Sequence, residues 1–239
     1  MTSLRIGAHR GAMVYAPENT LAAFEKAIEQ GAYRVEFDLR RSRDGHIVAI
    51  HDDSVDRTTD GSGAVRQMDL AELKKLRSGG EELPTFAETI ACMRGRTRML
   101  IELKDEDIAE QVVRQIEAEG VLDQCTLSSF HEPSLLAAHR LNPALELAYF
   151  LVEPKPFDAA QIVAELNARL LIVWPRAAEP EYIADAKANG MEVRCGFRDN
   201  LSYDETYAIF RQLADAGVEE FSCGRPDWIG QMIAAYNKD

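Results

Sequence analysis

The sequence lacks three features that would place the protein at a membrane or on a nucleic acid. Its apolar runs all fall short of the ~18 residues that a membrane-spanning helix needs, so no span is expected. Its formal net charge is −13 and it has no basic cluster of useful length, which excludes a nucleic-acid-binding surface or a polybasic membrane anchor. The first predicted strand, residues 4–8, is not preceded by a long apolar segment, so we expect no signal peptide and a cytoplasmic location.

Cysteines are few and scattered. The four are Cys92, Cys125, Cys195 and Cys223, and no two of them form a Cys-x-x-Cys pair. This spacing predicts free thiols in a reducing compartment and no zinc site. The Gly-x-Gly-x-x-Gly loop of dinucleotide-binding sheets is also missing, because the first predicted strand ends in His9-Arg10-Gly11.

The composition is that of an ordinary globular protein. Of the 239 residues, 46% are hydrophobic and 28% are charged, which excludes a disordered or collagen-like chain. A chain of this length buries about 70% of its surface on folding, enough for a core without disulfides or metals as staples. No low-complexity segment, long linker or change in composition divides it, so we predict a single domain over residues 1–239.

Short apolar runs alternate with amphipathic stretches along the whole chain, and Pro, Gly or Asn separates most of them. The apolar runs predict strands at residues 4–8, 33–39, 47–51, 98–103, 125–128, 146–151, 170–174, 192–197 and 220–222. Helical periodicity, with a first cap at Asn19 or Thr20, predicts helices near residues 21–31, 69–77, 85–94, 106–119, 132–141, 158–168, 179–189, 202–216 and 226–236.

The connections between these elements predict the fold. Asp44-Gly45 is a strong turn signal, so the strands at 33–39 and 47–51 are expected to pair as an antiparallel hairpin. The other strands are separated by helices, which implies parallel pairing. Eight parallel strands with one hairpin return describe an α/β fold, the (β/α)8 TIM barrel, with an open doubly wound sheet as the alternative. Residues 52–84, rich in turn signals, are predicted to form a short inserted region.

Charged side chains stand at the carboxyl ends of three predicted strands, where barrel enzymes carry their working residues. They are His9 and Arg10 on the first strand, Glu36 and Asp38 on the second, and Glu102 and Lys104 on the strand at 98–103. Residues two apart on a strand point to the same face. A two-residue turn at Asp44-Gly45 would add His51 by placing it opposite Asp38, and a register slip of one residue would undo that pairing.

This set of residue types suits phosphoester chemistry. Three carboxylates without thiolates suit one hard divalent cation, Mg²⁺ or Ca²⁺. Arg10 beside Lys104 suits an anionic phosphoryl group, and two histidines suit one proton taken and one given. The predicted function is metal-assisted cleavage of a small-molecule phosphodiester. A catalytically silent ligand-binding barrel and a metal-dependent sugar isomerase are the alternatives, and the two basic residues favour a phosphate over a sugar.

A series of motifs occurs in order over the first 104 residues. They are His9-Arg10-Gly11, Pro17-Glu18-Asn19-Thr20, Glu36-Phe37-Asp38, Asp44-Gly45, His51-Asp52, Arg57-Thr58-Thr59 and Glu102-Leu103-Lys104. Together they resemble the glycerophosphodiester phosphodiesterase family. Weaker similarity to the same family continues at Ser128-Ser129-Phe130 and at Arg225-Pro226-Asp227.

The resemblance implies a barrel of the phosphatidylinositol-phospholipase-C-like type, with residues 52–84 helping to cover the site. It also implies roles for residues, with Glu36, Asp38 and Glu102 holding the cation, His9 and His51 as the acid–base pair, and Arg10 and Lys104 binding phosphate. Family members cleave glycerophosphodiesters to sn-glycerol 3-phosphate and an alcohol. The sequence is compatible with either order of proton transfer, and we favour His51 as the base and His9 as the acid.

Two departures from the family pattern bear on the substrate. Cys195-Gly196-Phe197 stands where many members carry Trp-Thr-Val on the seventh strand, and Cys223-Gly224 stands where many carry Thr-Asp. The first departure is expected to remove a wall of the glycerol pocket. The cysteines motivate an alternative function, a related phosphodiesterase acting on lysophospholipids or on another small phosphodiester.

Overall fold

The computed structural model describes residues 3–238. Its centre is a closed barrel of parallel strands, in which β1 pairs with β11 on one side and with β2 on the other. The barrel strands are β1 (Arg5–Ala8), β2 (Arg34–Arg41), β6 (Arg98–Leu103), β7 (Cys125–Ser128), β8 (Glu146–Leu151), β9 (Ala168–Val173), β10 (Glu192–Gly196) and β11 (Glu220–Cys223). The predicted (β/α)8 barrel is confirmed.

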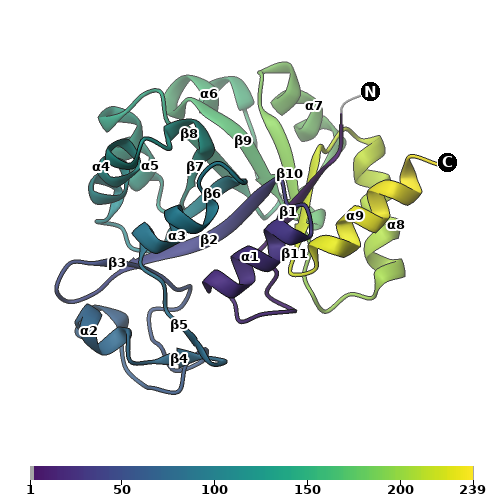
Figure 1. Ribbon diagram of the computed structural model, residues 1–239. Helices are drawn as coiled ribbons and strands as arrows, with labels where there is room; N and C mark the ends of the chain where they lie inside the picture. Colours follow the sequence, from purple (N-terminus) through teal and green to yellow (C-terminus); the bar gives the residue numbers. More distant parts are fainter. Residues whose placement is uncertain (1–2, 239) are drawn as a thin grey trace.

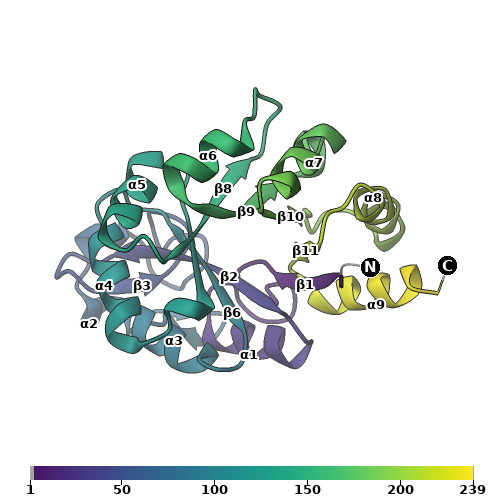
Figure 2. The same ribbon diagram turned by 90° about the horizontal axis from the view of Figure 1, so that it is seen from above.

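A helix follows each barrel strand, directly or, after β2, beyond the hairpin, and lies on the outside of the barrel (Figure 1, Figure 2). The helices are α1 (Leu21–Glu29), α3 (Phe86–Met93), α4 (Ala109–Glu119), α5 (Glu132–Leu141), α6 (Ala159–Leu166), α7 (Pro180–Ala188), α8 (Tyr203–Asp215) and α9 (Pro226–Tyr236). The Thr20 hydroxyl caps α1 by accepting from the Ala23 amide at 3.2 Å. No helix within residues 3–238 is long and apolar enough to cross a bilayer.

Apolar side chains fill the space between the barrel and its helices. Phe24 of α1, Phe37 of β2 and Phe86 of α3 are fully buried. The ring centroid of Phe37 lies 5.6 Å from that of Phe24 and 6.2 Å from that of Phe86, spacings at which aromatic pairs stabilise a core beyond the area they bury. This cluster holds α1 and α3 against β2, the strand that carries the candidate acidic residues Glu36 and Asp38.

Toward the amino ends of the strands, the barrel interior holds buried charges, which the strand patterns do not predict. Arg34, Arg194 and Glu220 are at most 2% exposed. The Arg34 guanidinium donates to Glu220 at 2.8 Å, and Arg194 forms an ion pair with the same carboxylate and donates to the Ala8 carbonyl at 3.0 Å. Buried charges are tolerated where each one meets a partner, as these do.

The hairpin after β2 has a register one residue away from the predicted one. Strand β3 (Ile47–Ala49) pairs with β2 so that Leu39 faces Ala49, and the Ile50 amide donates to the Asp38 carbonyl at 3.0 Å. The prediction that Asp38 faces His51 is therefore wrong. The loop holds three residues instead of two, because Arg43 and Asp44 form the tight turn and Gly45, at φ +89°, follows it as a left-handed residue.

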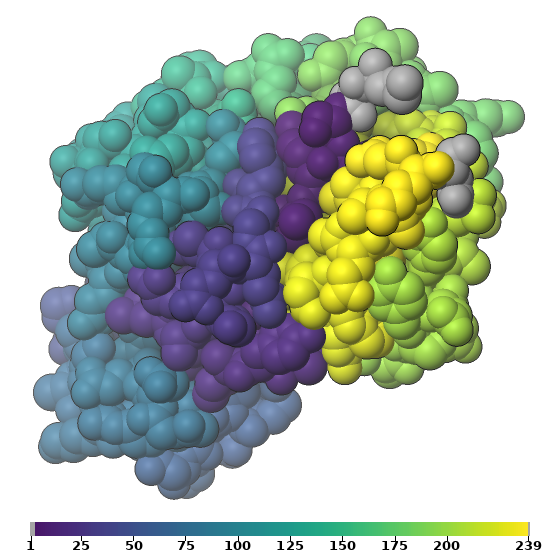
Figure 3. Space-filling view, turned by 45° about the vertical axis from the view of Figure 1, so that its right-hand side comes forward, coloured from purple at the N-terminus to yellow at the C-terminus, as the bar shows by residue number. Residues whose placement is uncertain are grey.

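Residues 52–84 form a lobe beside the barrel, at the lower left in Figure 3. The lobe contains the 3₁₀ turn η1 (Val65–Gln67), helix α2 (Leu70–Leu73) and a hairpin of β4 (Arg77–Ser78) and β5 (Glu81–Glu82). It has a small core of its own with Val48, Ile50, Val55, Val65, Leu73 and Leu83. The helix predicted at 69–77 ends at Leu73, because the chain soon enters β4. Two further 3₁₀ turns, η2 (Leu122–Gln124) and η3 (Pro175–Ala177), precede β7 and follow β9.

Candidate active site

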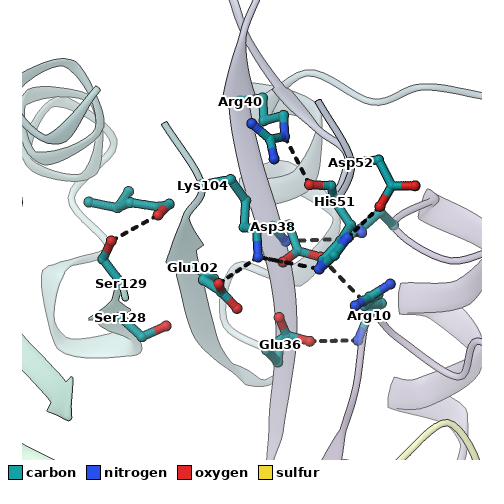
Figure 4. A network of polar contacts seen from close by, with 12 residues as sticks. Arg10, Glu36, Asp38, Arg40, His51, Asp52, Glu102, Lys104, Ser128 and Ser129 are labelled. Atoms are coloured by element: carbon teal, nitrogen blue, oxygen red, sulfur yellow. Dashed lines mark hydrogen bonds and ion pairs between the residues drawn. The ribbon is translucent and has the colours of Figure 1, made fainter. Parts of the chain in front are cut away.

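Three carboxylates meet at the carboxyl end of the barrel. Glu36 and Asp38 lie on one face of β2, and Glu102 is the register partner of Asp38 on β6 (Figure 4). Each offers one oxygen atom, and these oxygens lie within 4.8 Å of one another. All three side chains are buried, so water screens their mutual repulsion poorly.

The electrostatics of this cluster fit a bound divalent cation. Burial, followed by the charges of Asp38 and Glu102, raises the pKa of Glu36 well above its usual value. Burial and the Asp38 charge likewise raise the pKa of Glu102 to about 7. The Oδ1 atom of Asp38 is buried without a hydrogen-bond partner. Converging carboxylate oxygens with an unsatisfied buried acceptor are the donor set that Mg²⁺ and Ca²⁺ prefer.

Asn19 positions the central carboxylate, a role that sequence reasoning missed. Its side-chain amide nitrogen donates to Asp38 Oδ2 at 2.9 Å, and its side-chain oxygen Oδ1 accepts from the Asp38 backbone amide at 3.1 Å. Asn19 is 3% exposed and its backbone is left-handed, at φ +57°. The sequence suggested only a helix cap here, whereas Thr20 makes the cap and Asn19 holds the acid. Its place in the Pro17-Glu18-Asn19-Thr20 motif was the available signal.

His51 reaches the cluster although it lies beyond the paired part of the hairpin. The Arg40 side chain donates to the His51 backbone carbonyl at 2.8 Å and fixes the chain there. The His51 Nδ1 atom lies 2.6 Å from an Asp52 oxygen, and its Nε2 atom lies 3.3 Å from Lys104 Nζ. A lysine ammonium can only donate, so Nε2 faces the site with its lone pair, while Nδ1–H donates to Asp52.

His9, the residue that follows β1, faces the same cluster. Its Nε2 atom lies 4.0 Å from Glu36 Oε2, and its Nδ1 atom is buried without a hydrogen-bond partner. Burial, followed by the charge of Arg10, lowers the pKa of His9 to about 4. His9 is therefore a neutral imidazole at neutral pH in the protein without substrate.

The two candidate phosphate-binding side chains, Lys104 and Arg10, lie beside the carboxylates. Lys104 Nζ donates to Glu102 at 2.7 Å and lies 3.9 Å from Asp38 Oδ1. The Arg10 backbone amide donates to Glu36 at 2.8 Å, and its guanidinium Nε lies 3.5 Å from Asp38 Oδ2. The structure thus brings together all seven residues predicted from the sequence.

Gly11 permits the tight turn that aims Arg10 at the carboxylates. Its φ is +78°, and an added Cβ would lie 2.7 Å from the Ala23 carbonyl carbon of α1. No other residue type allows both this backbone conformation and this approach to the helix.

A chain of ion pairs links His51 to Arg10. The sequence did not predict these contacts. Arg57, from the inserted region, donates to Asp52 at 2.5 Å and to Glu18 at 2.8 Å. Glu18 in turn accepts from the Arg10 guanidinium at 2.9 Å. The lobe formed by residues 52–84 therefore contacts the site, and Arg57 couples the positions of both groups.

Cation affinity should rise with pH, because the ligand carboxylates must lose protons to bind. The pKa of Glu102 is raised to about 7, so a proton leaves it on binding at any pH below that value. Because the pKa of Glu36 is raised as well, we expect affinity for Ca²⁺ or Mg²⁺ to rise by at least about tenfold per pH unit between about pH 5 and pH 7. Isothermal titration calorimetry at four pH values would measure this, and a pH-independent affinity would contradict it.

Comparisons with known proteins identify relatives of this chain. A sequence model of the Glycerophosphoryl diester phosphodiesterase family matches residues 9–227. A glycerophosphodiester phosphodiesterase of Caldanaerobacter subterraneus is 33% identical over 204 residues, which are 78% of this chain and 82% of the relative. One from Bacillus subtilis is 29% identical over 96% of this chain and 86% of its own length.

Solved structures of similar proteins share the fold along almost the whole chain. A glycerophosphodiester phosphodiesterase from Agrobacterium tumefaciens superposes with a TM-score of 0.84 at 30% identity, over 97% of this chain and 100% of its own. A phosphodiesterase from Oleispira antarctica, solved with the product sn-glycerol-3-phosphate, superposes with a TM-score of 0.83 at 30% identity, over 96% of each chain. The resemblance predicted from the motifs is thus confirmed. The chain belongs to the Glycerophosphoryl diester phosphodiesterase family, and it is an enzyme of that class.

Proposed function

We propose that this protein hydrolyses glycerophosphodiesters to sn-glycerol 3-phosphate and an alcohol, with one divalent cation, Mg²⁺ or Ca²⁺, held by Glu36, Asp38 and Glu102. The observation that carries this proposal is the group of three buried carboxylates whose oxygens lie within 4.8 Å of one another. The Oleispira antarctica structure with bound sn-glycerol-3-phosphate supports the product side of the reaction.

The cation, when bound, supplies charge neutralisation at the phosphate oxygens. The protein's own residues then orient the ester and move protons. Arg10 and Lys104 bind the remaining phosphate oxygens, since both positively charged side chains lie beside the carboxylates that would hold the metal ion. His51 takes a proton through its Nε2 lone pair from the nucleophile, either water or the neighbouring glycerol hydroxyl, as the nucleophile's oxygen bonds to phosphorus. The hydroxyl route gives a cyclic phosphate that water then opens. The Asp52 carboxylate beside Nδ1 stabilises the resulting imidazolium.

His9 gives its proton to the leaving alcohol in this proposal. Its pKa of about 4 in the substrate-free protein means that it holds few protons at neutral pH. An anionic phosphodiester beside the ring favours the protonated form, so His9 carries the proton when the ester is bound. The proton is then delivered where negative charge develops on the leaving oxygen.

Product analysis tests the proposal. The purified protein is incubated with several glycerophosphodiesters in Mg²⁺, in Ca²⁺ or in EDTA, and sn-glycerol 3-phosphate is measured with a coupled dehydrogenase. We expect release of this product in at least one of the cations and loss of at least 10²-fold in EDTA. Equal turnover in EDTA would overturn the cation's role, and absence of the product with every diester would overturn the reaction.

A further inference from the structure

A cavity of about 600 Å³ opens at the mouth of the barrel beside His9. Its walls are mostly apolar and include Met13, Trp174, Pro175, Phe197, Leu201 and Ile209. The three candidate cation ligands do not line it, so the cavity adjoins the active site through His9 alone. Its volume and apolar walls far exceed what the three-carbon, polar glycerol unit requires.

Trp174, which follows β9, forms the aromatic wall of this cavity. A Cβ atom added to Gly196 on the neighbouring strand β10 would lie 3.8 Å from Trp174 Cδ1. The indole ring therefore borders the space that a side chain at position 196 would enter.

Two guanidinium groups lie over the Trp174 ring. The Cζ atom of Arg176 lies 4.8 Å from the ring centroid, and that of Arg198 lies 5.4 Å away. Arg176 forms an ion pair with Glu153 outside the cavity lining, whereas Arg198 is exposed at the rim. The ring's preference for positive charge is thus met within the protein itself.

Asp199, the acidic side chain of the cavity lining, is already paired with a basic one. Asp199 accepts from the Gly224 amide at 2.8 Å, and its carboxylate lies 3.4 Å from the Arg225 guanidinium. Burial, the largest influence, raises the pKa of Asp199 above its usual value. A positively charged ligand would therefore meet the exposed Arg198 guanidinium in this cavity, beside an Arg176 that is paired with Glu153 and an acid that is paired with Arg225.

We propose that this cavity binds the leaving alcohol and selects alcohols that are apolar and carry no positive charge. The inference rests on the proposed function, in which His9 protonates the leaving oxygen, because the departing alcohol must then lie on the His9 side. A cationic alcohol such as choline gains most from an open aromatic face. At Trp174 it meets Arg176 and Arg198 instead, so a neutral body of the same shape binds better.

A matched pair of substrates isolates this charge preference. Glycerophosphocholine is compared with the ester of sn-glycerol 3-phosphate and 3,3-dimethylbutanol, which replaces the quaternary nitrogen by carbon and keeps the shape. With the cation-loaded protein at low ionic strength, we expect kcat/KM for the neutral ester to exceed that for the choline ester by about tenfold. The glycerol and phosphate groups are identical, so uniform effects on catalysis cancel.

Arg198→Gln tests the source of the preference. Removing this exposed charge should raise kcat/KM for the choline ester about threefold and change that for the neutral ester by less than about twofold. Arg114→Gln is the matched control, because Arg114 is an arginine on α4 whose side chain is 69% exposed. It should leave the ratio between the two esters unchanged.

The outcomes separate this inference from the proposed function. Equal kcat/KM for the two esters, or a choline preference, overturns the inference while the hydrolase activity stands. A strong preference for 1-acyl lysophospholipids combined with indifference to the alcohol would place the acyl chain in the cavity and also overturn it. Cleavage of neither ester, nor of any other glycerophosphodiester, refutes the proposed function itself.

Discussion

The His51→Ala variant is expected to turn over glycerophosphodiesters at least 10²-fold more slowly than the unchanged protein, within the usual range for loss of an acid–base group. The Nε2 atom of His51 faces the site, 3.3 Å from Lys104 Nζ, while Nδ1 is held 2.6 Å from Asp52. Alanine leaves no group at this position to take the proton of the nucleophile. The measurement is kcat for sn-glycerol 3-phosphate release at saturating cation.

His46→Ala is the matched control for this prediction. His46 lies directly after the hairpin loop with its side chain 55% exposed, and its loss should change kcat by less than about twofold. Asp52→Asn should give an intermediate loss of about tenfold, because the ring keeps its place while the charge that stabilises its protonated form is gone. Full activity of a folded His51→Ala protein would remove His51 from the acid–base pair.

The barrel was predictable because its physical signals are local and repeated. Each strand is a short apolar run, each helix has its own periodic face, and separators such as Gly31 or Gly120 fall between them. A helix between two strands then forces parallel pairing, so topology follows from order along the chain. The convergence of Glu36, Asp38 and Glu102 follows in turn, since parallel strands end at one face of a barrel.

Features that depend on one residue of register or on distant partners were not predictable. The hairpin loop is one residue longer than expected, because it contains Arg43 as well as Asp44 and Gly45, and that shifts every cross-strand pair. His51 still reaches the site because Arg40 holds its backbone carbonyl, a contact that alternation of strand residues does not encode. Asn19 and Trp174 gain their roles from neighbours far along the chain, so their local sequence carries little signal.

The Glu102→Gln variant is expected to lose at least 10²-fold in turnover and at least tenfold in cation affinity. Glutamine keeps the volume of the side chain and an oxygen near Lys104, but it removes one of three negative charges around the cation site. Calorimetric titration with Ca²⁺ or Mg²⁺ measures the affinity, and sn-glycerol 3-phosphate release measures the turnover. Glu106→Gln is the matched control, since Glu106 has a side chain that is 74% exposed, and it should change neither quantity.

The stability of the cation-free protein distinguishes loss of a ligand from loss of fold. The pKa of Glu102 is raised to about 7, above its unfolded value of 4.5, so its protonated form stabilises the fold at low pH. That stabilisation is lost as pH rises from about 4.5 to about 7. The melting temperature of the unchanged protein should therefore fall between these two pH values. Glutamine at position 102 resembles the protonated acid at every pH, so the variant should melt no lower at pH 8 and show a flatter pH profile. Unchanged cation affinity in the folded variant would show that Glu102 is not one of the ligands, whereas a variant that melts lower at pH 8 would owe its losses to a damaged fold.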